Sequence, residues 1–170
     1  MIVPILVDAL KRTVPFPQRT AGVVEKITGT GLTVAKNGAV SNTVTTPNKS
    51  AVKIGSYVLQ ANSSESLRIT SATVALGVSG SLSTTSLANM YIVTDGIASQ
   101  IIPAPQVSNN FTMSLTINAN TSKIVDVYAD ILNSNGGEAT TSITVSGYGL
   151  GSNISVSNAI AVAGQTIKVG

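Results

Sequence analysis

The 170-residue chain contains no cysteine, no histidine and no tryptophan. Without cysteine it can form neither disulfide bonds nor thiolate metal sites, and without histidine it lacks the base of Ser–His and Cys–His nucleophilic sites. A zinc site would have to be built from carboxylates alone. These absences favour a protein that is not an enzyme and that uses no cofactor or metal.

Charged side chains are also scarce, at 10% of the sequence, whereas about a quarter is usual. Serine, threonine, asparagine and glycine take their place. Because such a surface repels its own copies only weakly, it favours a protein that packs against itself or against cell-surface glycan.

The few charges are divided unevenly along the chain. Residues 1–68 contain eight basic and three acidic side chains, whereas residues 69–170 contain two basic and four acidic ones. This asymmetry suits head-to-tail contact between copies, because the two parts carry net charge of opposite sign. Nucleic acid is not an expected partner, since the basic residues are scattered and only four Tyr and two Phe can stack on bases.

Long hydrophobic runs are missing as well. The N-terminal stretch MIVPILVDALKRTVPFPQRT has an apolar run of about six residues, which Pro4 interrupts and which Lys11 and Arg12 follow rather than precede. This order does not match a secretory signal peptide. No segment approaches the length of a transmembrane helix, so we expect no transmembrane segment.

What the chain has in abundance is alternation of apolar and polar residues, which is typical of β-strands with one buried face. The clearest case is Val125 to Ile131, and Phe111 to Ile117 alternates in the same way. Because Asn118–Ala119–Asn120 supplies a turn, we predict that the two segments form a hairpin whose apolar face is covered by a second sheet. The predicted core residues are Phe111, Met113, Leu115, Ile117, Val125, Val127, Ala129 and Ile131.

Further strands are expected along the rest of the chain, separated by turns rich in Gly and Asn. The apolar face changes at Gly55–Ser56 and again between Ile69 and Ala72, which predicts a β-bulge in each of these strands. Asp95–Gly96 is typical of a two-residue hairpin turn. The remaining expected strands are Ala21–Ile27, Leu32–Lys36, a loop or weak edge strand within 37–48, Ala139–Val145 after the turn at 135–137, and Gln165–Val169.

No segment has the pattern of a long helix, and about nine strands at short spacing predict an all-β fold. We expect one domain, an antiparallel immunoglobulin-like or jelly-roll-type β-sandwich over residues 21–170. Residues 1–20 form an N-terminal extension to it.

The N-terminal extension is the candidate site of assembly. Residues 2–10 are apolar and have the pattern of an extended strand, and the prolines of residues 4–17 suit an edge strand followed by an extended connector. Either this segment acts as a donor strand for a neighbouring copy, or it is the first strand of its own sandwich. The face that it would present consists of Val3, Ile5, Val7 and Ala9.

Three other patterns resemble catalytic or binding sites. Asp126 and Asp130 share a strand face, but four residues at about 3.3 Å place them roughly 13 Å apart, too far for one metal ion or a glycosidase pair, so we interpret them as solvated. No Asp-rich loop supports calcium binding at Asp95 or Glu138. The glycines in SGYGLG, residues 146–151, indicate a bend or bulge rather than a phosphate loop, because no helix follows them.

Two patterns concern glycans. Tyr128 and Tyr148 are candidates for a sugar-stacking platform, although two tyrosines without tryptophan are more often cross-strand packing. Five N-glycosylation sequons are present, a number that a chain rich in Asn, Ser and Thr also produces by chance. Their asparagines are Asn48, Asn62, Asn110, Asn120 and Asn153.

The chain resembles the immunoglobulin-like β-sandwich modules of bacterial surface-layer and surface-filament proteins. The resemblance lies in the segments KIGSYVLQA, SLRITSATVAL, LANMYIVTDG, FTMSLTINANTSKIVDVYADI and GQTIKV, and it covers roughly residues 30–170. It implies a non-enzymatic part of an extracellular coat, stalk or fibre. Such modules commonly occur as tandem repeats, whereas this chain has a single copy with its own extension, which favours assembly by self-association.

These observations lead to one functional hypothesis and two rivals. The hypothesis is a structural subunit of an extracellular or cell-surface homopolymer, a pilus-like filament or a coat, whose copies are joined head-to-tail by β-strand addition. The rivals are a carbohydrate-binding or adhesive surface module and a virion or tail structural protein. An exposed aromatic cluster would distinguish the glycan binder.

Overall fold

The computed structural model describes residues 31–132 and 136–170, in which every regular element is a strand except one short 3₁₀ helix. The strands are β1 (Leu32–Lys36), β2 (Thr43–Thr45), β3 (Lys49–Ala61), β4 (Leu67–Ser79), β5 (Leu87–Thr94), β6 (Ile97–Ala98), β7 (Ser108–Ile117), β8 (Ser122–Ile131), β9 (Gly137–Gly149), β10 (Ser155–Ser157) and β11 (Val162–Val169). The 3₁₀ helix is Thr84–Ser86.

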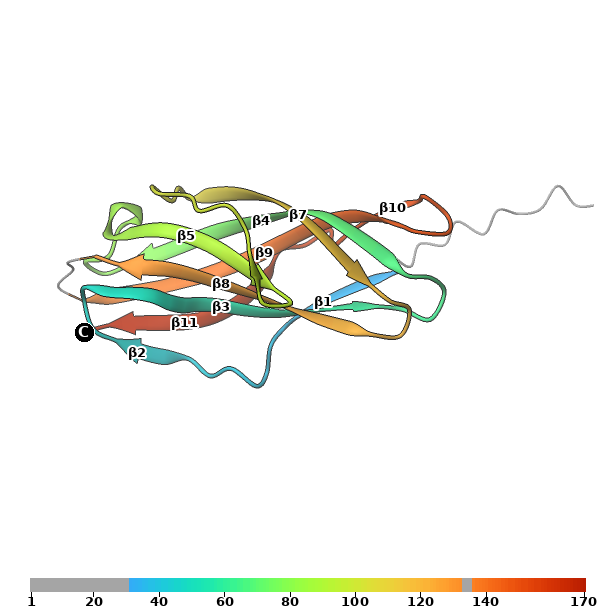
Figure 1. Ribbon diagram of the computed structural model, residues 1–170. Helices are drawn as coiled ribbons and strands as arrows, with labels where there is room; N and C mark the ends of the chain where they lie inside the picture. The colour runs from blue at the N-terminus through green and yellow to red at the C-terminus, as the bar shows by residue number, and fades with distance from the viewer. Residues whose placement is uncertain (1–30, 133–135) are drawn as a thin grey trace, which may run out of the picture.

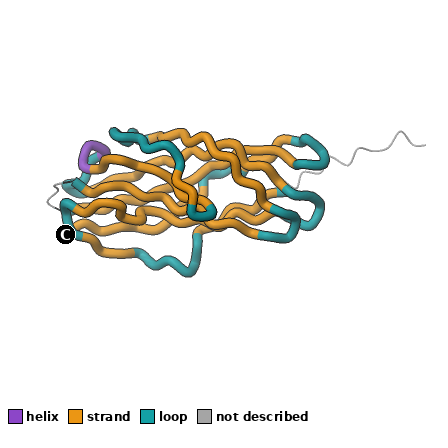
Figure 2. Tube along the Cα trace, viewed as in Figure 1, coloured by secondary structure: helices purple, strands orange, loops and turns teal. Residues whose placement is uncertain are grey.

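The strands form two sheets that pack face to face in an elongated β-sandwich (Figure 1, Figure 2). The first sheet has the order β1-β3-β8-β5-β6, and the second has the order β2-β11-β9-β4-β7, with β10 added to β9. Paired strands are antiparallel except β2 and β11, which run parallel. The predicted all-β sandwich is confirmed.

One expectation is wrong, because β7 and β8 do not form a hairpin. β7 pairs with β4 in the second sheet, whereas β8 lies between β3 and β5 in the first. A turn closed by a hydrogen bond from the Thr121 N–H to the Asn118 oxygen (3.0 Å) carries the chain across the core. Alternation identifies a buried face but not the partner strand, and two strands on opposite sides of one core show the same pattern.

The same crossing recurs along the chain. The long strands β3, β4, β5, β7, β8 and β9 lie alternately in the first and the second sheet. The predicted core residues therefore meet from opposite sheets rather than side by side. Seven of the eight are buried, and Met113 is partly buried.

Both predicted β-bulges are present. The ladder between β3 and β8 leaves Ile54 without an opposite residue, next to the predicted Gly55–Ser56, and the ladders of β4 skip Thr70. At this second bulge a Cβ atom on Gly147 would overlap the backbone oxygen of Arg68. The close approach of two backbones explains a glycine in SGYGLG, in agreement with the predicted bend or bulge.

The predicted hairpin turn is also confirmed. Asp95 and Gly96 have positive φ angles of 51° and 77° and connect β5 to β6. The strands predicted at 32–36, within 37–48, at 139–145 and at 165–169 are β1, β2, β9 and β11.

Several expectations concern residues that the structure does not describe. The strand predicted at Ala21–Ile27, the N-terminal extension, the boundary between residues 20 and 21, and Asn135 of the predicted turn all lie outside the described residues. Within the described ranges no helix is long and apolar enough to cross a membrane.

Candidate functional site

The sandwich has two lateral sides, where the edges of its sheets face each other. On one side, here called the closed side, residues 37–42 carry the chain from β1 in the first sheet to β2 in the second. On the other, here called the open side, β6 is the last described strand of the first sheet and β7 the last described strand of the second. The two sides differ in how the gap between the sheets is filled.

The open side contains a groove of about 330 Å³. Residues of β5 and β6 form one wall, and three consecutive residues of β7 form the other. We call it the open-side groove. Its lining residues are Ile92, Thr94, Ile97, Ala98, Ser99, Thr112, Met113 and Ser114.

Met113 marks the point at which the core is uncovered. It lies on the core face of β7 between Phe111 and Leu115, which are 1% and 4% exposed, yet Met113 itself is only partly buried. The first sheet ends here in the two-residue strand β6, which is much shorter than the ten-residue β7. A flexible, polarizable methionine suits a surface that adapts to an incoming side chain.

The groove also has hydrogen-bonding capacity, and one of its lining residues, Ile97, is a strongly exposed apolar side chain. In the described part of the chain β7 is a terminal strand, and every second residue of such a strand directs its N–H and C=O away from the sheet. Ile97, Ile101 and Val107, in the stretch that leads into β7, are 72%, 57% and 67% exposed. An apolar surface beside a terminal strand can be covered by an added β-strand.

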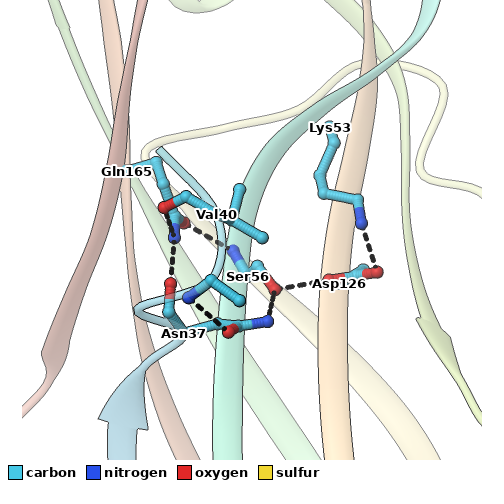
Figure 3. A network of polar contacts seen from close by, with 7 residues as sticks. Asn37, Val40, Lys53, Ser56, Asp126 and Gln165 are labelled. Carbon is cyan, nitrogen blue, oxygen red and sulfur yellow. Dashed lines mark hydrogen bonds and ion pairs between the residues drawn. The ribbon is translucent and has the colours of Figure 1, made fainter. Parts of the chain in front are cut away.

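A buried polar network seals the closed side (Figure 3). Gln165 of β11 is 1% exposed; it accepts a hydrogen bond from the Ser56 N–H (2.8 Å) and donates to the backbone oxygens of Asn37 (3.0 Å) and Val40 (3.1 Å). The Asn37 amide donates to the Ser56 hydroxyl (2.9 Å). Among the described residues, no buried side-chain N or O atom lacks a partner. The network therefore holds β3, β11 and the crossing segment in one arrangement.

This network continues to an ion pair on the outer face of the first sheet. The Ser56 hydroxyl donates to one oxygen of Asp126 (2.6 Å), and the Lys53 ammonium lies 2.7 Å from the other (Figure 3). The hydrogen bond to Asp126 raises the pKa of Lys53, against the opposing effect of partial burial. The interpretation of Asp126 as solvated is therefore wrong, because its carboxylate is bound on both oxygens.

Asp130 also has hydrogen-bond partners, but these bonds lie at the exposed surface, in agreement with its interpretation as solvated. Its carboxylate accepts hydrogen bonds from the Ala51 N–H (2.8 Å) and from the Asn89 side-chain amide (2.7 Å). Asp126 and Asp130 thus have separate sets of partners, which bind β8 to β3 and β5.

Tyr128 packs across strands, as the structural interpretation predicted, but its partner is Tyr91. The two rings stack with their centroids 5.3 Å apart and an interplanar angle of 12°, and the Lys53 ammonium lies 5.6 Å from the Tyr128 centroid. Because β3 and β5 flank β8 on opposite sides, Lys53 and Tyr91 cover both faces of the Tyr128 ring. Tyr148 lies on β9 in the second sheet, so the candidate sugar platform is not formed.

The other acidic candidates form ion pairs with lysines. Asp95 pairs with Lys123 (2.9 Å), and Glu138 pairs with Lys168 (3.3 Å). Nowhere in the described ranges do three acidic side chains gather in a way that could hold a metal ion.

The predicted assembly and glycosylation residues have different outcomes. Val3, Ile5, Val7 and Ala9 lie outside the described residues, so their role stays a prediction. The open-side groove was missed by sequence reasoning, because alternation predicted that Met113 is buried like its neighbours. All five sequon asparagines are exposed: Asn48, Asn62, Asn110, Asn120 and Asn153.

The chain matches no protein-family model and no curated protein sequence. Solved structures give weak likenesses over 82% of this chain. One is the CssB subunit of colonization factor CS6 of enterotoxigenic Escherichia coli, complemented with a donor strand from CssA, at 14% identity and a TM-score of 0.41 over 97% of that chain.

Two further likenesses are to enzymes. A family 123 glycoside hydrolase from Clostridium perfringens is 16% identical with a TM-score of 0.43, and this chain covers 27% of its length. AvmM, which catalyses macrocyclization in alchivemycin A biosynthesis, is 12% identical with a TM-score of 0.43 over 87% of its length. Scores below 0.5 do not identify a common fold, and nothing about the function of this chain follows from them.

Proposed function

We propose that the protein is a non-enzymatic structural subunit of an extracellular homopolymer, a pilus-like filament or a surface coat. Its copies are joined head-to-tail by β-strand addition, in which residues 2–10 of one copy lie in the open-side groove of the next. The observation that carries this proposal is the groove itself, an apolar hollow beside the terminal strand β7, with the partly buried Met113 in its lining.

The chemistry of the segment matches that of the groove. Main-chain hydrogen bonds to β7 supply affinity, and the alternate side chains Val3, Ile5 and Val7 fill the hollow. At about 1.5 to 3 kcal/mol for each fully buried side chain, the three contribute at least about 5 kcal/mol before the costs of association. Charge contributes less, because exposed ion pairs are worth about 0 to 1 kcal/mol and are screened by salt.

Residues 11–30 connect this segment to the sandwich. Twenty residues span at most about 70 Å when fully extended, which is enough to reach a neighbouring copy. The same length also allows the segment to lie in the groove of its own copy, and the state of assembly distinguishes the two arrangements.

The test is negative-stain electron microscopy of the full chain beside three variants. Deletion of residues 1–12 and the double variant Val3→Asp/Ile5→Asp remove the donor, and Ala98→Phe fills the groove. Ala163→Phe, at an exposed position of β11, is the matched control. We expect wild-type and control filaments that survive high salt, and no filaments from the three variants, all of which stay folded.

Other outcomes contradict the proposal. Filaments that persist after the deletion rule out strand addition by this segment. A deletion that unfolds the domain shows that the strand belongs to its own sandwich. Closed shells or tubes favour the virion or tail rival, and a wild-type protein that stays monomeric contradicts a homopolymer.

A further inference from the structure

The closed-side network contains an Asn–Gly dipeptide at the point where the chain leaves β1. Asn37 is followed by Gly38, and the Val40 N–H donates to the Asn37 backbone oxygen (3.2 Å), which closes a turn. A Cβ atom on Gly38 would meet no atom within 4 Å, so the space beside this glycine is open. An asparagine amide is most readily attacked by the next backbone nitrogen when glycine follows, because no side chain hinders the approach.

In the folded protein both polar atoms of the Asn37 amide are bound. Its Oδ1 atom accepts a hydrogen bond from the Ala39 N–H (3.0 Å), and its Nδ2 atom donates to the Ser56 hydroxyl (2.9 Å; Figure 3). Asn37 is 8% exposed and Ser56 is 0% exposed. Attack on the amide carbon expels Nδ2, so the bond to Ser56 has to break first. The network therefore protects this amide.

The network accepts an amide at position 37 but not a carboxylate. The Ser56 hydroxyl has one proton, which it donates to Asp126 (2.6 Å), so it has none left for a second acceptor. A carboxylate at position 37 has no proton to donate to Ser56, and it adds a second negative charge near Asp126. An isoaspartate would instead lengthen the backbone and displace the Asn37 carbonyl, which accepts a hydrogen bond from Gln165 (3.0 Å).

We propose that Asn37 is a site of spontaneous modification, which the closed-side network protects and which, once modified, prevents the network from forming again. When the closed side opens, the Gly38 nitrogen attacks Asn37 Cγ and forms a C–N bond, and Nδ2 leaves as ammonia with the proton of the Gly38 nitrogen. Water then adds to one of the two carbonyl groups of the cyclic imide and breaks its C–N bond to Gly38. The products are aspartate or isoaspartate, and water is the one co-reactant.

The test measures the fraction of Asn37 converted while the full chain is incubated at mildly alkaline pH, either folded or in urea. Cleavage after Lys36 and Lys49 releases residues 37–49, and tandem mass spectrometry locates the replacement of NH₂ by OH at residue 37. We expect conversion to be about tenfold slower, or more, in the folded chain, because two hydrogen bonds of a buried amide have to open first. Equal rates overturn the inference, and so does an unfolded chain in which Asn37 is not converted.

Two variants separate the chemistry from the protection. Gly38→Ala places a methyl group in open space at a residue whose φ angle is not positive, so it should fold normally and lose most of the conversion in urea. Ser56→Ala removes the partner of Nδ2 and should raise the rate in the folded chain about fivefold, whereas Ser41→Ala, exposed in the same crossing segment, should not. Full conversion in Gly38→Ala overturns the imide route, and equal rates for the two serine variants overturn protection by the network.

The last measurement concerns the damage that modification does. Asn37→Asp reproduces one product and should lower the melting temperature by about 4 °C or more, because a buried hydrogen bond is replaced by two facing acceptors. Asn42→Asp makes the same change of charge in the same segment, but its side-chain oxygen can still accept the hydrogen bond from the Thr166 N–H (3.0 Å). We expect this control to melt within about 2 °C of the wild type. Equal melting temperatures of the two variants would show that modification leaves the network intact and would overturn the inference.

Discussion

The closed side and the open side border the same core, yet each gap between the sheets is filled by a different kind of interaction. On the closed side, Gln165, Ser56 and Asn37 satisfy one another's hydrogen-bonding groups. Because these hydrogen bonds are directional, they fix one arrangement of the side chains without a second protein. On the open side, Met113 faces an apolar groove. The hydrophobic effect that would fill this groove is not directional, and the terminal strand β7 can form hydrogen bonds with a further strand. The hydrogen-bonded network leaves the closed side with no buried polar side-chain group to satisfy among its described residues, whereas the apolar groove beside β7 leaves the open side able to bind an added strand.

The largest expected effect is in the core that both sides share. Val127 is 0% exposed, so Val127→Asp buries an unpaired carboxylate at a cost of several kcal/mol, against a total stability of about 5 to 15 kcal/mol. We expect the domain to unfold, as measured by circular dichroism and thermal melting. Ile124→Asp, on the outer face of the same strand and 49% exposed, is the folded control. A soluble Val127→Asp variant that melts cooperatively would contradict the assignment of the core.

The next effect tests the closed side. Gln165→Leu keeps the approximate size of the side chain but leaves the Ser56 N–H and the Val40 carbonyl group without their partner, whereas the Asn37 oxygen keeps the hydrogen bond from the Val40 N–H. We expect the free energy of unfolding, measured in denaturant, to fall by about 2 to 6 kcal/mol, at about 1 to 3 kcal/mol for each of the two orphaned groups. The control is Gln60→Leu at an exposed position of β3, for which a change within about 0.5 kcal/mol is expected. Equal values for the two variants would show that the network does not hold the closed side.

A smaller effect depends on pH and concerns the polar contacts between the sheets near the closed side. Tyr57 is buried and its hydroxyl lies 2.7 Å from that of Thr141; burial raises the pKa of Tyr57 to about 12. Because the pKa in the folded state is above the ordinary value of 10.0, the stabilisation is complete below pH 10 and is lost as the pH rises towards 12. We expect the free energy of unfolding of the wild type to fall by about 2 kcal/mol over this pH range.

The control for this titration is Tyr57→Phe, in which the loss of stability at alkaline pH should be reduced. Tyr148→Phe, at a position that is 37% exposed, should keep it. If the free energy of unfolding depends on pH in the same way in the wild type and in Tyr57→Phe, the Tyr57 phenol titrates in the folded protein as it does in the unfolded chain.

The smallest expected change in stability tests the open side. Leu115→Ala removes a side chain that is 4% exposed and should cost about 2 to 5 kcal/mol, whereas Met113→Ala, two residues away on the same face, should cost less than about 1.5 kcal/mol. Met113→Ala should nevertheless weaken filament formation, because it removes part of the groove lining. Equal losses of stability in urea unfolding would mean that Met113 is packed like the rest of the core and that the groove is closed.

Much of the local structure could be predicted from the sequence. The alternation around Val127 predicted a buried strand face, the changes of face near Gly55 and Thr70 predicted bulges, and Asp95–Gly96 predicted a tight turn. Each of these features depends on the backbone and side-chain preferences of a few consecutive residues. Such preferences do not depend on which strand lies alongside.

The pairing of strands and the candidate site were decided by the tertiary structure. β7 and β8 follow one another in the sequence but lie in different sheets. The sequence pattern does not distinguish this arrangement from a hairpin within one sheet, because either arrangement buries the same apolar side chains. Gln165 and Ser56 are 109 residues apart, and the groove joins residues 92–99 to residues 112–114. Period-two alternation indicates which side chains are buried. Contacts between residues far apart in the chain decide which strand edges meet and whether the gap between the sheets is filled by hydrogen bonds or left apolar.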